Sequence, residues 1–194
     1  MGKSAVARCI AARYEYGCIS TDDIGKAVSS VYSTLSRNKI DPMDGMDWRE
    51  YFTQTSVDLL LDYDAESHKR MWPALDKIIR AHSTWSDSLV IEGYALWPEQ
   101  VIAAGFTATG AIWLTCDDLL LESRIRSRPD FYRGAADEET LINNFLRRSS
   151  RYNELMLKSA AQCSATVINV ISDHSVRGVA DLCVSALTGK STGK

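Results

Sequence analysis

The chain opens with MGKSAVARCI (residues 1–10), and its Gly2-Lys3-Ser4 triplet governs how the rest of the sequence is interpreted. Gly-Lys-Ser closes the phosphate-binding loop G-x-x-x-x-G-K-[ST], in which backbone N–H groups and the lysine surround phosphate and the hydroxyl binds Mg²⁺. A helical pattern follows, and the N-terminus of a helix attracts anions. The triplet also occurs by chance, so an ordinary exposed N-terminus is the alternative.

Two aspartates stand between the next strand and helix. Residues 4–15 predict a helix and residues 18–20 a short strand, after which Asp22 and Asp23 supply the acidic first turn of a helix over residues 24–35. Carboxylates at the carboxyl end of a parallel strand orient substrate hydroxyls, act as general bases or bind Mg²⁺ through water. Helix capping alone explains one aspartate well and two less well.

Strands and helices alternate along the remaining chain. Residues 48–85 carry a helical pattern, in which Pro73 either kinks or restarts a helix. Buried strands are predicted in SLVIEG (88–93), GAIWLTC (110–116) and TVINVI (166–171), with helices over residues 98–104, 117–127, 137–160 and 174–187 and a loop at SRPDFYRGA (127–135). This alternation indicates an α/β fold with a mostly parallel sheet.

Glu92 ends the apolar strand of SLVIEGYALWP (88–98). A carboxylate after a buried strand holds Mg²⁺ or positions an attacking group, as a Walker B acid does. The alternative is a strand-end carboxylate that faces water. Gly93 and the bulky Tyr94 and Trp97 favour the functional interpretation, because they suggest the wall of a pocket.

Two arginine clusters stand out in an acidic protein. They are Arg124, Arg126, Arg128 and Arg133 in ESRIRSRPDFYRG, and Arg147, Arg148 and Arg151 in FLRRSSRYNELM. Arg124 and Arg128 lie four apart, as on one helix face, and Arg147 and Arg151 repeat this spacing. A solvated basic face, paired with the acidic residues 137–139, explains any single arginine. For the clusters we favour an anion site.

Composition excludes several classes of protein. With 45% hydrophobic and 24% charged residues, the 194-residue chain is typical of one globular domain. The net charge of −3 argues against a general nucleic-acid binder. The five cysteines form no C-x-x-C pair, so reduced thiols in a cytoplasmic protein are expected rather than a zinc site. No apolar run is long enough for a membrane span.

In their order, these segments resemble the P-loop kinases of small metabolites and, more narrowly, the 2-phosphoglycerate kinase-like family. The likeness rests on GKSAVARCIAARY, CISTDDIGKAV, LVIEGYALWPEQV and RIRSRPDFYRG…FLRRSSRYNELM, which together span nearly the whole chain. The resemblance implies a three-layer P-loop fold with a parallel sheet flanked by helices, and ATP with Mg²⁺ as phosphoryl donor. It also implies one domain over residues 1–188, with a helical insertion at 38–85, an arginine-rich lid at 124–151 and a disordered tail at 189–194.

The resemblance assigns roles residue by residue. Gly2, Lys3 and Ser4 fall on the P-loop that binds ATP, and Ser4 and Glu92 on the Mg²⁺ ligands. Asp22 and Asp23 fall where a carboxylate orients or deprotonates the acceptor hydroxyl. Arg124 and Arg128 neutralise charge around ATP and act in catalysis together with Lys3. The residues expected to bind the acceptor, besides the two aspartates, are Tyr94, Arg133, Arg147, Arg148 and Arg151.

The function expected on this basis is ATP-dependent phosphorylation of a small anionic metabolite, with a phosphoglycerate-like acid first. The expected partners are ATP and this acceptor, without nucleic acid or membrane. Two alternatives stay open, namely a non-catalytic nucleotide-binding or regulatory protein and a P-loop kinase that acts on another hydroxyl acceptor.

The family begins with a central strand and a glycine-rich loop, whereas only Met1 precedes Gly2 here. Loss of a central strand would leave its two neighbours with unpaired backbone groups, which is costly when they are buried. Met1 is therefore interpreted as an internal residue of a longer reading frame. The alternative is a genuinely shortened protein that binds ATP poorly.

Overall fold

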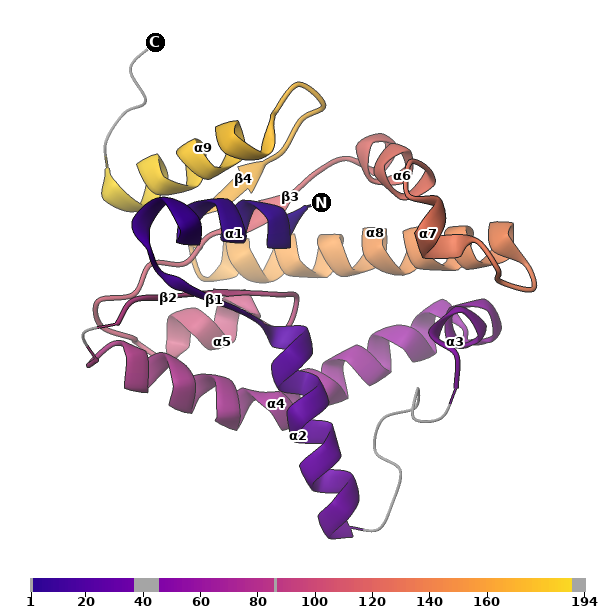
Figure 1. Cartoon of the computed structure of the whole chain (residues 1–194), viewed down its shortest axis with the longest axis horizontal. Coiled ribbons are helices and arrows are strands. Elements are labelled where there is room, and N and C mark those ends of the chain that lie inside the picture. The colour runs from indigo at the N-terminus through magenta and orange to yellow at the C-terminus, as the bar shows by residue number, and fades with distance from the viewer. Residues whose placement is uncertain (1, 37–45, 86, 190–194) are drawn as a thin grey trace.

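The computed structural model describes residues 2–36, 46–85 and 87–189, in which helices and strands alternate (Figure 1). The helices are α1 (Lys3–Tyr14), α2 (Thr21–Ser36), α3 (Trp48–Gln54), α4 (Val57–His82), α5 (Pro98–Ala103), α6 (Asp118–Arg126), α7 (Pro129–Tyr132), α8 (Glu138–Gln162) and α9 (Val176–Thr188). The strands are β1 (Gly17–Ser20), β2 (Leu89–Glu92), β3 (Trp113–Thr115) and β4 (Val167–Asn169). The mixed α/β composition predicted from the sequence is confirmed.

The described strands form two parallel pairs. β1 pairs with β2, and β3 pairs with β4. The parallel direction was expected, but the prediction of one sheet is wrong for the described residues, because no ladder joins the two pairs there. A ladder requires a neighbouring strand about 4.8 Å away, and β2 and β3 each have such a neighbour on one edge. For the same reason β2 is half-buried along its length rather than buried as predicted.

Two hydrophobic cores lie on opposite faces of the β3–β4 pair. Successive side chains of a strand point to opposite faces, so Leu114 packs in the core shared by α1, α6 and α9, whereas Trp113 packs against α5 and α8. α1 and α9 lie side by side on the first face (Figure 1). The indole N–H of Trp113 donates to the carbonyl of Leu96 at 2.8 Å, which ties β3 to the segment after β2.

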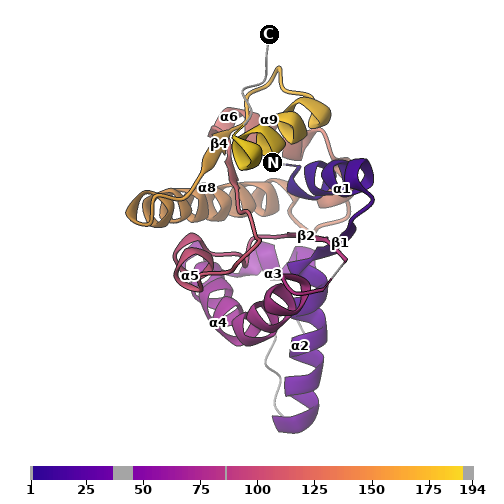
Figure 2. The same cartoon turned by 90° about the vertical axis from the view of Figure 1, so that its left-hand side faces the viewer.

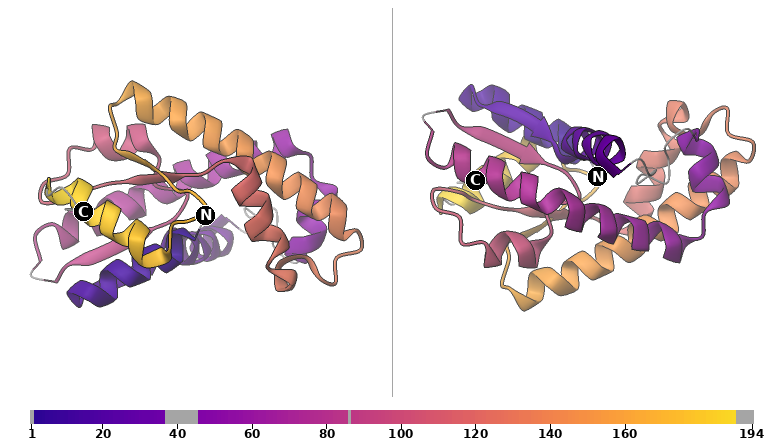
Figure 3. Two further views of the ribbon diagram at one scale, coloured as in Figure 1. Left: turned by 90° about the horizontal axis from the view of Figure 1, so that it is seen from above. Right: turned by 90° about the horizontal axis from the view of Figure 1, so that it is seen from below.

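The predicted helical insertion forms α3 and α4, together with residues outside the described ranges. Ser56 separates the two helices, because its side chain accepts a hydrogen bond from the N–H of Leu59 and caps α4. Pro73 lies inside α4, so of the two predicted alternatives, a kink or a restart, the restart is excluded. α4 packs against α2 on one side and α8 on the other (Figure 3). The far half of α2 extends away from α4 (Figure 2).

The arginine-rich segment differs from its prediction in two ways. α6 ends at Arg126, and Arg128 precedes the short helix α7, so Arg124 and Arg128 do not share a helix face. Pro129 is the reason, because a proline disfavours helical backbone at the residue before it and readily occupies the first position of a new helix. The stretch predicted as a loop therefore contains a helix. Of the predicted disordered tail, only Gly189 lies among the described residues, where it caps α9.

In the described part of the chain, no helix combines the length and apolar character that crossing a lipid bilayer requires.

Candidate functional site

The β1–β2 register brings two of the predicted carboxylates to one edge. Ser20 is level with Glu92, and both residues end their strands. The chain enters α2 directly after Ser20, whose hydroxyl accepts from the N–H of Asp22 at 3.2 Å. Asp22 and Asp23 lie in the first turn of α2, as predicted. The carboxyl ends of two adjacent parallel strands thus present acidic side chains from separate segments.

Gly93 and Thr21 pack closely against each other directly after the ends of β2 and β1. A Cβ atom added to Gly93 would lie 1.8 Å from Oγ1 of Thr21, and the φ of Gly93 is +146°. Only glycine permits this conformation and this approach. Thr21 is fully buried, and its Oγ1 has no partner in the described residues. Thr21 was not predicted as a site residue, because nothing in its local sequence pattern shows that it lies against Gly93.

Lys3 joins the carboxylates from the N-terminus of α1. Burial lowers the pKa of the Lys3 ammonium, while the negative charges of Glu92 and Asp22 act to raise it. The charge of Arg148 also lowers the Lys3 pKa, and Cys116, just beyond β3, acts on it as well. Lys3 therefore lies within electrostatic reach of the ends of both β2 and β3.

Of the two aspartates, Asp22 is the one that interacts with the charges of Lys3, Glu92 and Arg148. Its pKa is raised, first by desolvation and then by the charges of Glu92 and Asp23, against the opposing effects of Lys3 and Arg148. Its side chain nevertheless remains in contact with solvent, as does that of Asp23. A carboxylate with a raised pKa beside a cation suits proton transfer, so Asp22 is the better candidate for a general base.

The start of α1 supplies a hydroxyl and backbone donors. Gly2 takes the left-handed conformation with φ 76°, and no side chain caps the first turn. Ser4 is half-buried in that turn. Mg²⁺ takes few protein ligands and completes its shell with water and phosphate oxygens, so the Ser4 hydroxyl and the carboxylate of Glu92 are a suitable donor set. Among the described residues, no cluster of three His, Cys, Asp or Glu side chains forms a metal site by itself.

Arg148 is the predicted arginine that lies deepest in the protein. Its Nε donates to Oδ2 of Asp64 on α4 at 2.8 Å, and the two side chains are only 13% and 16% exposed. The guanidinium carbon lies 5.2 Å from the ring centre of Tyr94 and 5.4 Å from that of Tyr152. Tyr94, predicted as the wall of a pocket, thus contacts an arginine of the chain.

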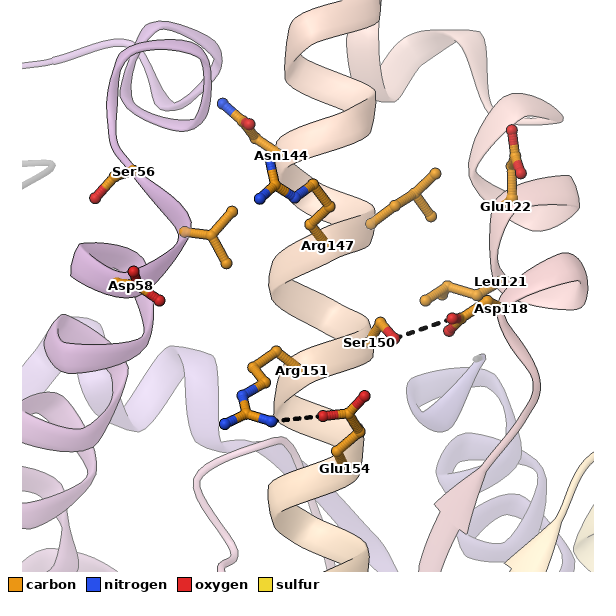
Figure 4. A pocket seen from close by; sticks show the side chains of 12 residues that line it. Ser56, Asp58, Asp118, Leu121, Glu122, Asn144, Arg147, Ser150, Arg151 and Glu154 are labelled. Carbon is orange, nitrogen blue, oxygen red and sulfur yellow. Dashed lines mark hydrogen bonds and ion pairs between the residues drawn. The ribbon is translucent and has the colours of Figure 1, made fainter.

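Arg147 and Arg151 line a separate hollow of about 620 Å³ between α4, α6 and α8 (Figure 4). The predicted spacing places both on one face of α8. Arg151 pairs with Glu154 at 2.7 Å, whereas Arg147 is exposed and has no ion-pair partner in the described residues. Across the hollow lie carboxylates, of which Asp118 accepts from the hydroxyl of Ser150 at 3.0 Å. The hollow therefore carries charges of both signs.

The lid arginines take different positions. The charge of Arg124 lowers the pKa of Cys116, although burial raises it overall, so Arg124 lies near the end of β3. Arg126 pairs with Glu122 and Glu139 on the surface, which is the solvated-face alternative rather than an anion site. Arg128 and Arg133 lie exposed at the two ends of α7 and form no ion pair within the described ranges.

No model of a known protein family matches this chain, and a comparison with curated proteins likewise finds no match.

Proposed function

We propose that this protein is an ATP-dependent phosphotransferase of the P-loop kinase type, which phosphorylates a small anionic metabolite such as a phosphoglycerate-like acid. The observation that carries the proposal is the meeting of Lys3 with Asp22 and Glu92 at the carboxyl ends of β1 and β2. Phosphoryl transfer requires a cation for the phosphate oxygens, carboxylates for Mg²⁺ and a base for the acceptor. These three residues, together with Ser4, offer all of those groups.

The arrangement of the strands supports the same proposal. In the family that the sequence resembles, the strand leading into the P-loop lies in the middle of the sheet. Here β1–β2 and β3–β4 are separate pairs, and Lys3 is influenced by residues at the ends of β2 and β3. We infer that the two pairs belong to one three-layer P-loop fold, with Lys3 near the carboxyl ends of both.

Each residue then has a chemical task. Bound ATP with Mg²⁺ supplies the phosphoryl group that is transferred. Lys3 and the backbone N–H groups of the first turn of α1 bind phosphate oxygens, and Ser4 and Glu92 hold the metal. Asp22 orients the acceptor hydroxyl and accepts its proton, with Asp23 as the alternative. Arg124 neutralises charge from the side of β3.

The hollow beside α8 is where we place the acceptor. Arg147, an exposed cation with no ion-pair partner among the described residues, suits a carboxylate or phosphate of the substrate, and Arg151 becomes available if Glu154 releases it. Arg128 and Arg133 would take part only if α7 moves toward the site, as a lid does.

Calorimetric titration with Mg·ATP tests the proposal, with transfer measured on phosphoglycerate-like acids and on sugars. Lys3→Ala should weaken Mg·ATP binding about tenfold or more, since it removes a charge-assisted contact. Lys158→Ala, which removes an exposed lysine of α8, is the matched control and should bind as the native protein does. Asp22→Asn should keep Mg·ATP binding and lose transfer.

Three results separate the alternatives. Binding that depends on Lys3 and is followed by transfer supports the kinase, and the acceptor that turns over names its class. Binding that depends on Lys3 without transfer to any acceptor favours the nucleotide-binding regulatory protein. Equal behaviour of Lys3→Ala and the native chain would overturn the proposed site.

A further inference from the structure

The ion pair between Arg148 and Asp64 joins two helices in the interior. Both side chains are mostly buried, and Oδ2 of Asp64 contacts Nε at 2.8 Å and Nη2 at 2.5 Å. On the same helix, Arg151 and Glu154 form a pair that is 58% and 61% exposed. The two pairs therefore combine the same charges in opposite environments.

Stability alone is a weak reason for such a buried pair. Removing two charges from water is costly, and well-packed apolar residues of similar volume often stabilise a protein equally well. The cost is visible at Asp64, where burial raises the pKa of the carboxyl despite the opposing charge of Arg148. A charge kept at this expense in the interior calls for a second role.

The geometry leaves part of the guanidinium unused. Asp64 occupies Nε and Nη2, and the guanidinium carbon lies over the rings of Tyr94 and Tyr152. Nη1 has no hydrogen-bond partner in the described residues and is not among their fully buried unpaired atoms, so it retains access to solvent. A guanidinium has five N–H donors in a fixed plane, and both N–H bonds of Nη1 remain available to a ligand.

The cation also lies near the proposed phosphate site, because its guanidinium carbon is 5.2 Å from the ring centre of Tyr94, which follows Glu92 and Gly93 directly after β2. The charge of Arg148 acts on Lys3 and on Asp22, the two residues that meet at the ends of β1 and β2. A ligand oxygen that lies between Lys3 and Nη1 would meet two cations that come from α1 and α8. This is the arrangement that binds a phosphate with two or more anionic oxygens.

We propose that Arg148 binds a phosphate oxygen of the ligand at the Lys3 site, and that Asp64 is the positioning residue that holds its guanidinium with Nη1 free. The inference rests on the proposed phosphate chemistry of that site and assigns a role to Asp64, which the sequence did not single out. Tyr94 and Tyr152 complete the support, because the guanidinium carbon lies over both of their rings.

The experiment measures binding by calorimetry with two probes, Mg·ATP and 2-phosphoglycerate, so that donor and acceptor phosphates are distinguished. Arg148→Ala and Asp64→Asn should each weaken the affinity about tenfold for the probe whose phosphate Arg148 holds. Glu66→Gln, which breaks the exposed pair with Lys69 on the helix that carries Asp64, should stay within about twofold of the native affinity.

Chemical rescue separates positioning from structural support. Millimolar guanidinium should restore binding to Arg148→Ala, where Asp64 can still orient the added ion. It should not restore binding to the double variant Asp64→Asn/Arg148→Ala. Equal rescue of both variants would overturn the role of Asp64.

A second double variant keeps the proposal testable if the polar variants fail to fold. Asp64→Leu/Arg148→Met replaces the pair with apolar side chains, which proteins commonly tolerate, and circular dichroism checks its folding. A folded double variant that binds both probes at native affinity overturns the inference. If Lys3→Ala loses affinity while both Arg148 variants keep it, the inference fails and the proposed function stands; if the native chain binds neither probe, both fail.

Discussion

His68 should make the protein sensitive to acid. Its side chain is buried against the rings of Tyr94, Trp97 and Tyr152, and its Nε2 has no partner in the described residues. Burial, with a smaller effect from the charge of Arg148, lowers the pKa of His68 from 6.5 to about 4. In the folded protein the imidazole therefore stays neutral where the unfolded chain would already bind a proton.

The sign and size of the effect follow from proton linkage. Between pH 6.5 and pH 4 the unfolded chain binds more protons at His68 than the folded protein does, so the free energy of unfolding falls as the pH falls. The contribution is fully present above pH 6.5. With the two pKa values above, the loss is about 2 kcal/mol at pH 5 and about 3 kcal/mol at pH 4.

Urea unfolding, followed by the fluorescence of the five tryptophans, measures this loss at pH 7.5, 6, 5 and 4. His68→Phe removes the titrating group and keeps an aromatic ring, so its free energy of unfolding should fall by about 2–3 kcal/mol less than that of the native protein over this range. His82→Gln, at the end of the same helix, is the matched control. Parallel pH profiles for the native protein and His68→Phe would refute the reasoning, whatever their absolute stabilities.

Three further substitutions test the packing. Gly93→Ala should lower the free energy of unfolding in urea by about 2–4 kcal/mol, because its Cβ would overlap Thr21. Gly105→Ala, which lies in open space at φ +59°, is the control and should lower it by about 1 kcal/mol. Similar losses for the two variants would contradict the close approach of Thr21 to Gly93. Leu75→Ala, at a fully buried position, should lower the free energy of unfolding by about 2–5 kcal/mol, against less than about 0.5 kcal/mol for Leu119→Ala at an 80% exposed position. Asp117→Ala removes the 2.7 Å cap on the N–H of Leu120 and should cost about 1 kcal/mol in the same assay; no change would show that the cap contributes nothing.

The elements of the fold were largely predictable from the sequence. α1, α8 and α9 lie close to the ranges that the apolar spacing predicts, β1 adds Gly17 to the predicted CIS, and β2 lies within the predicted SLVIEG. These features depend on neighbours within a few residues, where helical and strand periodicities and capping groups act directly. A local rule with two outcomes left the prediction open at Pro73, which α4 accommodates, and gave a wrong one at Pro129, which begins α7 instead of lying in a loop.

The candidate site was predictable as a set of residues but not as an arrangement. The motifs named Lys3, Asp22 and Glu92, and the structure places their charges within reach of one another. The same motifs grouped all the arginines together. The structure instead buries Arg148 against Asp64, engages Arg126 with surface carboxylates and leaves Arg147 exposed.

By itself, then, the sequence determined the order and type of the elements and the chemical groups at their ends, because these follow from local periodicity and residue chemistry. Only the tertiary structure decided that the strands form two pairs, that Thr21 lies under Gly93 and that Asp64 meets Arg148 across 84 residues. Such contacts depend on how whole helices and strands pack, and desolvation acts on a side chain only after distant segments have closed around it.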